Sequence, residues 1–236
     1  WKNGEAEGAF QLEGLDLAAI ARVQSLREGT AGRIQASAKV KGRVADGVAE
    51  LRGVDGEGSL REVVVGGRRY GELAMTAVTR AGGEVDISMK GSLRGSPIAS
   101  TSTWRLTEGF PVRGRLGFGV VPFSVLNELR PSYVAAQQWP FQGSFRGNVT
   151  FEGPAADLDQ WKVDVSIEGL NARPERRQEL PGRTTAQDFE LKSEGPLRFR
   201  ADGRTITIQQ AKFTGRDTSL SASGTFSLAE RRPWDL

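Results

Sequence analysis

The sequence contains no cysteine and no histidine among its 236 residues. The missing cysteine excludes a disulfide framework, a thiol nucleophile and a thiolate metal site. The missing histidine removes the commonest general base and metal ligand, and with it a serine triad of the usual kind. Any catalysis would have to use carboxylates, serine with lysine, or tyrosine. We therefore expect no catalytic residues, no metal and no cofactor.

Other features are also scarce. No run of about 20 apolar residues exists, so no membrane span is predicted, and no signal peptide is visible. Lys plus Arg number 32 against 29 Asp plus Glu, and both signs are scattered along the chain, which disfavours nucleic acid as a partner. The chain opens at Trp1 without methionine, and Trp234 and Leu236 resemble the start of another strand. We expect an internal piece of a longer protein.

Alternation of apolar and polar side chains is abundant. It runs through residues 32–42, 83–95, 143–153 and 161–170, and it recurs on both sides of a Gly-Arg-Asp-Thr break within residues 205–228. A two-residue period is typical of strands in a sheet with one apolar face. Short turns such as Gly66-Gly67, Gly82-Gly83 and Asp202-Gly203 separate the runs. The sequence predicts an all-β fold.

The apolar positions of these strands are the candidate lining of one continuous surface. They are Ile34, Val40, Ile87, Met89, Phe145, Val149, Phe151, Val165, Ile206, Ile208, Leu220 and Phe226. The glycines with the same parity are Gly42, Gly91, Gly147, Gly153 and Gly224. Glycine on the concave side of a sharply bent sheet permits an approach that a side chain would block. We therefore expect an elongated, curved, antiparallel-type sheet folded into a U-shaped groove, apolar inside and polar outside.

Two stretches depart from the alternation. Residues 15–26 and 121–129 have apolar side chains at helical spacing, which predicts two short amphipathic helices. Neither has the basic polar face of a membrane-surface helix, so we expect each to plug one end of the β core.

An internal repeat accompanies these helices. Residues 143–153 match residues 32–42 at a shift of 111, each after one of the helices, and residues 220–226 match residues 87–93 at a shift of 133. We therefore expect two repeating units, 1–110 and 111–236, of which the second contains a polar insert at 171–192.

Two other motifs are interpreted as ordinary connections. Residues 54–58, VDGEG, lack the further spaced ligands of a calcium loop and predict a turn. Asp157 and Asp159 resemble a glycosidase carboxylate pair, but they fall in a polar strand connection, where solvated acids are usual. We expect that the protein is not an enzyme.

The glycine-bounded alternating strands, the run LRFRADGRTITIQQAKFTGRDTSLSASGTFSL and the helix motifs LDLAAI and VPFSVL together resemble the TamB/AsmA-like envelope proteins, most clearly over residues 111–236. The resemblance implies a repeating β-groove, or taco, fold in a long periplasmic protein of a diderm bacterium, anchored in the inner membrane outside this piece. It implies phospholipid transport between the two membranes. It also implies outer-membrane protein assembly beside an Omp85-type barrel, reached through regions outside this piece.

Three functions stay open. An apolar groove could carry phospholipid acyl chains, because moving a chain of about 16 carbons into water costs on the order of 12 kcal/mol. An open sheet edge could instead act as a scaffold or chaperone for outer-membrane strands through β-augmentation. The same alternation could also fill the closed core of a structural β-repeat in a surface protein. The repeat, the glycine parity and the resemblance favour the groove.

Overall fold

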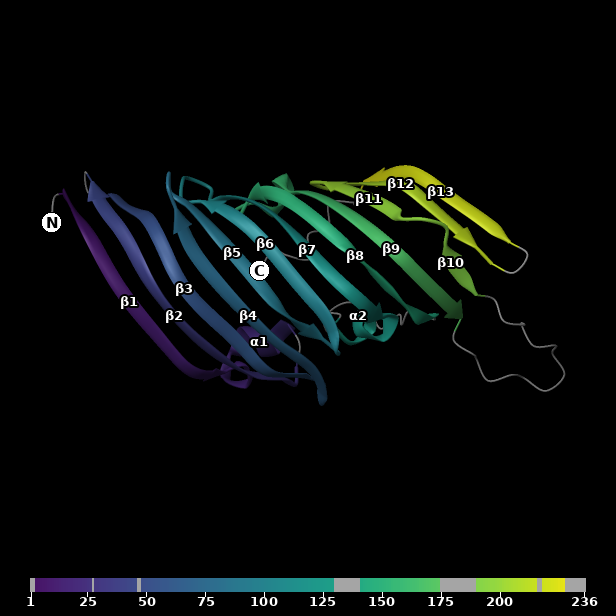
Figure 1. Cartoon of the computed structure of the whole chain (residues 1–236), viewed down its shortest axis with the longest axis horizontal. Coiled ribbons are helices and arrows are strands. Elements are labelled where there is room, and N and C mark those ends of the chain that lie inside the picture. The colour runs from purple at the N-terminus through teal and green to yellow at the C-terminus, as the bar shows by residue number, and fades with distance from the viewer. Residues whose placement is uncertain are drawn as a thin grey trace.

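The computed structural model describes residues 3–26, 28–45, 48–129, 141–174, 190–215 and 218–227. Thirteen strands in these residues form one antiparallel sheet (Figure 1). The strands are β1 (Asn3–Asp16), β2 (Thr30–Ala45), β3 (Val48–Val65), β4 (Arg68–Arg80), β5 (Glu84–Leu93), β6 (Ser96–Arg105), β7 (Pro111–Pro122), β8 (Phe141–Pro154), β9 (Lys162–Pro174), β10 (Leu191–Ser193), β11 (Leu197–Asp202), β12 (Thr205–Thr214) and β13 (Ser219–Ser227). The helices are α1 (Ala21–Leu26) and α2 (Phe123–Leu129), with short 3-10 turns η1 (Leu17–Ala19) and η2 (Leu158–Gln160).

The sheet is an up-and-down meander in which strands β1 to β9 pair in chain order. β10 and β11 are two halves of one strand position, because each pairs with β9 on one side and with β12 on the other. β13 pairs with β12. The predicted all-β fold, with one large antiparallel sheet and two short helices, is confirmed.

The sheet continues across the predicted boundary between units 1–110 and 111–236. β6 pairs with β7 through seven residue pairs, from Ile98–Phe118 to Trp104–Val112. Of the predicted insert 171–192, residues 171–174 extend β9 and residues 191–192 begin β10, while 175–189 lie outside the described residues. Trp234 and Leu236 also lie outside them.

The predicted repeat agrees with the strand order only in part. A helix precedes β2 and another precedes β8, and the matched segments 32–42 and 143–153 fall in these two strands. Residues 87–93 lie in β5, three strand positions after β2, whereas residues 220–226 lie in β13, four positions after β8. The second matched pair therefore occupies different places in the meander. The division into two units stays a prediction.

Glycine turns join the strands where the sequence predicts them. Gly66 and Gly67 connect β3 to β4, with φ of 56° and 78°, and Gly82 and Gly83 connect β4 to β5, with φ of 80° and 76°. These left-handed backbones are typical of tight hairpins whose twist matches that of the strands.

The predicted turn at residues 54–58 is wrong, because the whole segment lies inside β3. Val54 pairs with Val40 of β2, and its backbone N–H donates to Thr79 Oγ1 of β4 at 2.8 Å. The Thr79 backbone N–H in turn donates to the Asp55 carboxylate at 2.7 Å. The aspartate and glycines that suggest a turn are thus held extended by a strand on each side, so tertiary pairing overrides local preference.

The helix predicted over residues 15–26 is shorter and interrupted. Leu15 and Asp16 end β1, and the Asp16 carboxylate caps η1 by accepting a hydrogen bond from the Ala18 backbone N–H at 2.9 Å. Ile20 is extended, with φ −89° and ψ 104°, so α1 begins only at Ala21. The second helix begins at Phe123 rather than at residue 121.

The buried core is small and lies beside α2. Its buried cluster comprises Val65, Tyr70, Val121 and Val125, and Val63, Leu93, Phe118 and Phe145 pack against it. β3 and β4 are separated from β7 and β8 by two other strands, so this cluster requires the sheet to curve until these parts meet around α2. Both helices lie at the same end of the strands, the lower end in Figure 1. The prediction that a helix plugs one end of the core is confirmed for α2.

Candidate functional site

The twelve predicted lining residues all lie on one face of the sheet. Residues paired directly across neighbouring strands point to the same side. The first row of such pairs crosses every strand position from β1 to β13: Phe10, Ala38, Gly56, Ala77, Ile87, Ser102, Gly114, Phe151, Val163, Ala201, Ile206 and Phe226. At about 4.8 Å between strands, this row follows the sheet for about 50 Å.

Two further rows run alongside the first. The second row is Leu12, Ala36, Gly58, Met75, Met89, Ser100, Leu116, Val149, Val165, Phe199, Ile208 and Gly224. The third row lies nearer the helices and is Leu15, Ile34, Leu60, Leu73, Gly91, Ile98, Phe118, Gly147, Ile167 and Leu197. The remaining predicted lining residues, Val40, Phe145 and Leu220, share this face through their partners Val54, Val121 and Phe213. We call this surface the apolar face.

The apolar face is only partly covered. Phe10 in β1 is 52% exposed, Met75 in β4 is 45% exposed and Phe226 in β13 is 48% exposed. The strands of the described ranges all belong to the one sheet, so these ranges supply no second sheet to close over this face. The closed two-sheet core, which the alternation alone would also fit, is therefore not what the described residues form.

Two of the five predicted bend glycines lie where neighbouring strands approach very closely. A Cβ on Gly147 would lie 2.1 Å from the backbone oxygen of Ser166 in β9. A Cβ on Gly91 would lie 2.1 Å from the backbone oxygen of Glu72 in β4. Backbone atoms cannot rotate away as side chains do, so any larger residue would have to push the strands apart. Both glycines therefore permit the close approach that a concave apolar face needs.

The other three glycines differ from one another. A Cβ on Gly153 would lie 2.6 Å from the indole of Trp161, which stacks on Phe151 with ring centroids 5.6 Å apart. A Cβ on Gly42 would meet only one backbone oxygen, at 3.2 Å. A Cβ on Gly224 would meet nothing within 4 Å, although its φ of 150° strains any other residue. Close approach thus explains Gly153 and does not explain Gly224.

The opposite face is polar. Ion pairs link its neighbouring strands, with 3.0 Å between Arg80 Nε and Asp86 Oδ2 and 3.0 Å between Arg200 Nε and Asp164 Oδ1. A shallow hollow of about 740 Å³ opens on this face between β4 and β11. Most of its lining side chains are charged or carry hydroxyl groups, and Val78, Ile87 and Phe151 are also among the lining residues.

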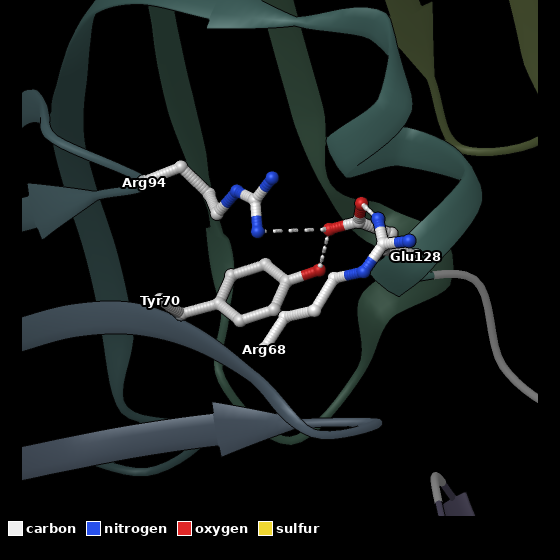
Figure 2. A network of polar contacts seen from close by, with 4 residues as sticks. All are labelled: Arg68, Tyr70, Arg94 and Glu128. Carbon is white, nitrogen blue, oxygen red and sulfur yellow. Dashed lines mark hydrogen bonds and ion pairs between the residues drawn. The ribbon is translucent and has the colours of Figure 1, made fainter.

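Four polar side chains meet where α2 contacts β4 (Figure 2). The Tyr70 hydroxyl donates to Glu128 Oε2 at 2.5 Å, and the Arg68 guanidinium donates to Glu128 Oε1. Arg94 Nη1 lies 3.9 Å from Glu128 Oε2, and its guanidinium carbon lies 5.8 Å from the centre of the Tyr70 ring. We call these four residues the Glu128 cluster.

The Glu128 cluster fixes the charge of its members. Burial raises the pKa of Glu128, but hydrogen bonds from Tyr70 and Arg68 and the positive charges of Arg94 and Arg68 outweigh it, so the pKa lies below its usual value. Burial raises the pKa of Tyr70, and so do the hydrogen bond to Glu128 and its negative charge. At neutral pH the carboxylate is therefore charged and the phenol protonated. Sequence reasoning missed this cluster because its members lie up to 60 residues apart; the one hint is that Glu128 is the only charged residue of α2.

The carboxylate pair of the β8–β9 connection has structural partners. Asp157 accepts hydrogen bonds from the Asp159 backbone N–H at 3.0 Å and from Gln160 Nε2 at 2.8 Å. Asp159 forms an ion pair with Arg204 at 3.3 Å. Over the described ranges, no group of three or more carboxylates gathers that could hold a metal ion.

No protein family, curated protein or solved structure matches this chain. The class of the protein therefore rests on its own geometry, which is a single antiparallel sheet with one apolar and one polar face. Among the described helices, none is long and apolar enough to cross a membrane.

Proposed function

We propose that this chain is a segment of a TamB/AsmA-like bridge that spans the periplasm of a diderm bacterium, and that its apolar face carries phospholipid acyl chains between the inner and outer membranes. The observation that carries the proposal is the pair of apolar rows that cross every strand position from β1 to β13. An acyl chain loses about 0.8 kcal/mol for each CH₂ that enters water. A surface for moving it must therefore be apolar along most of its length, and these rows are apolar except for Ser102 and Ser100 of β6.

The composition of the rows also suits a mobile ligand. The rows combine large side chains with glycine and alanine; in the first row Ala38, Gly56 and Ala77 lie in succession between Phe10 and Ile87. The large side chains offer contact to hydrocarbon, whereas a Cβ on Gly56 would lie 2.4 Å from the backbone oxygen of Ser37, so this glycine lets neighbouring strands pack closely beneath the ligand. The rows contain two hydroxyl groups, both in β6, and that of Ser102 accepts a hydrogen bond from Trp104 Nε1 at 3.0 Å. The rows include no charged side chain.

A scaffold for outer-membrane proteins is the second candidate, and β13 favours it. Every residue of this strand is exposed, and within the described residues it pairs on one side only, with β12. Such an edge presents backbone N–H and C=O groups to an incoming strand. The lipid proposal ranks first because an edge strand does not require the apolar rows in the middle of the sheet.

Site-specific photo-crosslinking in the full-length protein in cells tests the proposal. The crosslinking residue replaces Ile208 of the second row or, as a matched control, its neighbour Thr207, whose hydroxyl contacts Thr225 on the polar face. A second pair, Ile87 and Ser88, makes the same comparison in β5.

We expect phospholipid adducts, identified by mass spectrometry, at Ile208 and Ile87 and none at Thr207 or Ser88. Absence of lipid from both apolar positions in folded protein would contradict lipid carriage. Adducts at Ile208 but not at Ile87 would contradict a path that continues across the sheet. Adducts with outer-membrane proteins at β13 instead would favour the scaffold.

A further inference from the structure

Helix α2 covers one section of the apolar face. Val125 is 1% exposed and Phe123 is 6% exposed. The Phe123 ring lies 5.4 Å from that of Phe145, which lies 5.6 Å from that of Phe118, measured between centroids. Phe118 belongs to the third row and lies two residues along β7 from Leu116 of the second row. The helix thus fills space directly beside the rows assigned to acyl chains.

The short helix α2 depends on tertiary contacts to stay in this place. It has seven residues, and isolated helices shorter than about 12–15 residues are marginal in water. On undocking, Phe123 and Val125 would be exposed, and so would the part of the apolar face beneath them unless hydrocarbon covered it. Docking therefore depends on packing against the apolar face and on the contacts of Glu128.

The Glu128 cluster holds α2 from across the sheet. The chain enters α2 directly from β7, whereas Arg68 and Tyr70 belong to β4 and Arg94 lies in the turn between β5 and β6 (Figure 2). Three groups from β4 and from the β5–β6 turn thus converge on one carboxylate, whose side chain is 14% exposed. Bonds of this charged kind are about twice as strong as neutral ones.

We propose that α2 is a stop for acyl chains, and that Glu128 and Tyr70 are the positioning residues that keep it docked. With α2 docked, hydrocarbon is confined to the first and second rows. With α2 undocked, the section around Phe118 and Phe145 joins the binding surface. This inference rests on the proposed lipid carriage, because without acyl chains there is nothing for α2 to stop.

The first measurement follows the docking of α2 by thiol labelling. The chain has no native cysteine, so Val125→Cys gives one reporter that reacts only when α2 opens. Loss of a hydrogen bond to a charged group corresponds to a factor of about 10 to 100 in an equilibrium constant. We expect Glu128→Gln to speed labelling by about that factor. Tyr70→Phe, which keeps the ring in the core but removes one hydrogen bond to the same carboxylate, should speed it by a factor in the same range.

The control is Arg33→Gln, which removes an exposed ion pair with Glu62, 3.8 Å long, away from the Glu128 cluster. It should leave the labelling rate of Val125→Cys unchanged. Unchanged labelling in Glu128→Gln and Tyr70→Phe would overturn the role of these residues, and equal acceleration in all three would show general destabilisation instead.

The second measurement maps where hydrocarbon lies. A photoactivatable 16-carbon fatty acid is crosslinked to the purified protein, and the labelled residues are identified by mass spectrometry. In the native protein we expect adducts on the first and second rows and none at Phe118 or Phe145. In Glu128→Gln and Tyr70→Phe we expect adducts to extend to both. If adducts stay confined to the two rows in variants whose α2 has opened, the role of α2 as a stop is overturned. If neither the native protein nor the variants form adducts, the proposed lipid carriage itself is overturned.

Discussion

Substitution of Gly147 by alanine tests whether glycine permits the close packing of β8 against β9. The new methyl carbon would lie 2.1 Å from the backbone oxygen of Ser166, so the two strands would have to move apart by about 1 Å. Overpacking a well-packed site costs about 1–3 kcal/mol, and a clash with backbone belongs at the upper end. Alanine also restricts the unfolded chain, which returns about 0.4–1 kcal/mol. We expect a net loss of about 2 kcal/mol in the free energy of unfolding.

Gly8→Ala is the matched control. Gly8 lies on the same apolar face, opposite Val40, and a Cβ there would meet nothing within 4 Å. With no clash, only the effect on the unfolded chain remains, so we expect a gain of about 0.4–1 kcal/mol. Urea unfolding followed by circular dichroism measures both variants. With a slope of about 3 kcal/mol per molar, Gly147→Ala lowers the midpoint by about 0.7 M. Equal midpoints for the two variants would refute the argument that crowding selects glycine at position 147.

Two further predictions concern the core and the Glu128 cluster. Leu197 is 1% exposed, so Leu197→Ala should lower the free energy of unfolding, measured with urea, by about 2–5 kcal/mol. Leu220 is 51% exposed, so Leu220→Ala should lower it by less than about 1 kcal/mol. Similar losses in the two variants would mean that Leu197 is not enclosed. Glu128, with its lowered pKa, stabilises docking above its ordinary value of 4.5 and loses that contribution as pH falls through the pKa of the folded state. Tyr70, with its raised pKa, contributes below its ordinary value of 10.0 and loses its contribution as pH rises beyond that value. The labelling rate of Val125→Cys is divided at each pH by the labelling rate of a free thiol. This ratio should be lowest and constant between about pH 5 and 9, and should rise below and above that range. A steady rise of the ratio through neutral pH would contradict these assignments.

The sequence predicts the apolar face well because a two-residue period is a local property. Ile206 and Ile208 in one strand and Leu220 and Phe226 in the next need only alternation to fall on one side, and the pairing register places them there. The serines of β6, such as Ser100 and those at positions 96 and 102, interrupt the apolar pattern, so alternation of apolar and polar residues does not reveal that strand.

The curvature follows the prediction from glycine parity, but the register of the strands could not be predicted because it depends on bulges. The pairing shifts between Phe118 and Val121 in β7 and between Ile208 and Ala211 in β12, and each shift returns the next apolar residues to the same face. The Glu128 cluster depends on the same curvature, since only a bent sheet brings Tyr70 to α2. Such contacts between distant segments leave no periodic trace in the sequence.

The meander order has a consequence for how the molecule assembles. From β1 to β9 each new strand finds its partner in the strand just before it, so no segment has to wait for a distant one. Pairing between chain neighbours keeps loop closure short and is associated with faster folding. The sheet can therefore form strand by strand, from β1 onward, before the whole chain has been synthesised. A protein of this design can be lengthened by adding hairpins without changing how the earlier strands fold.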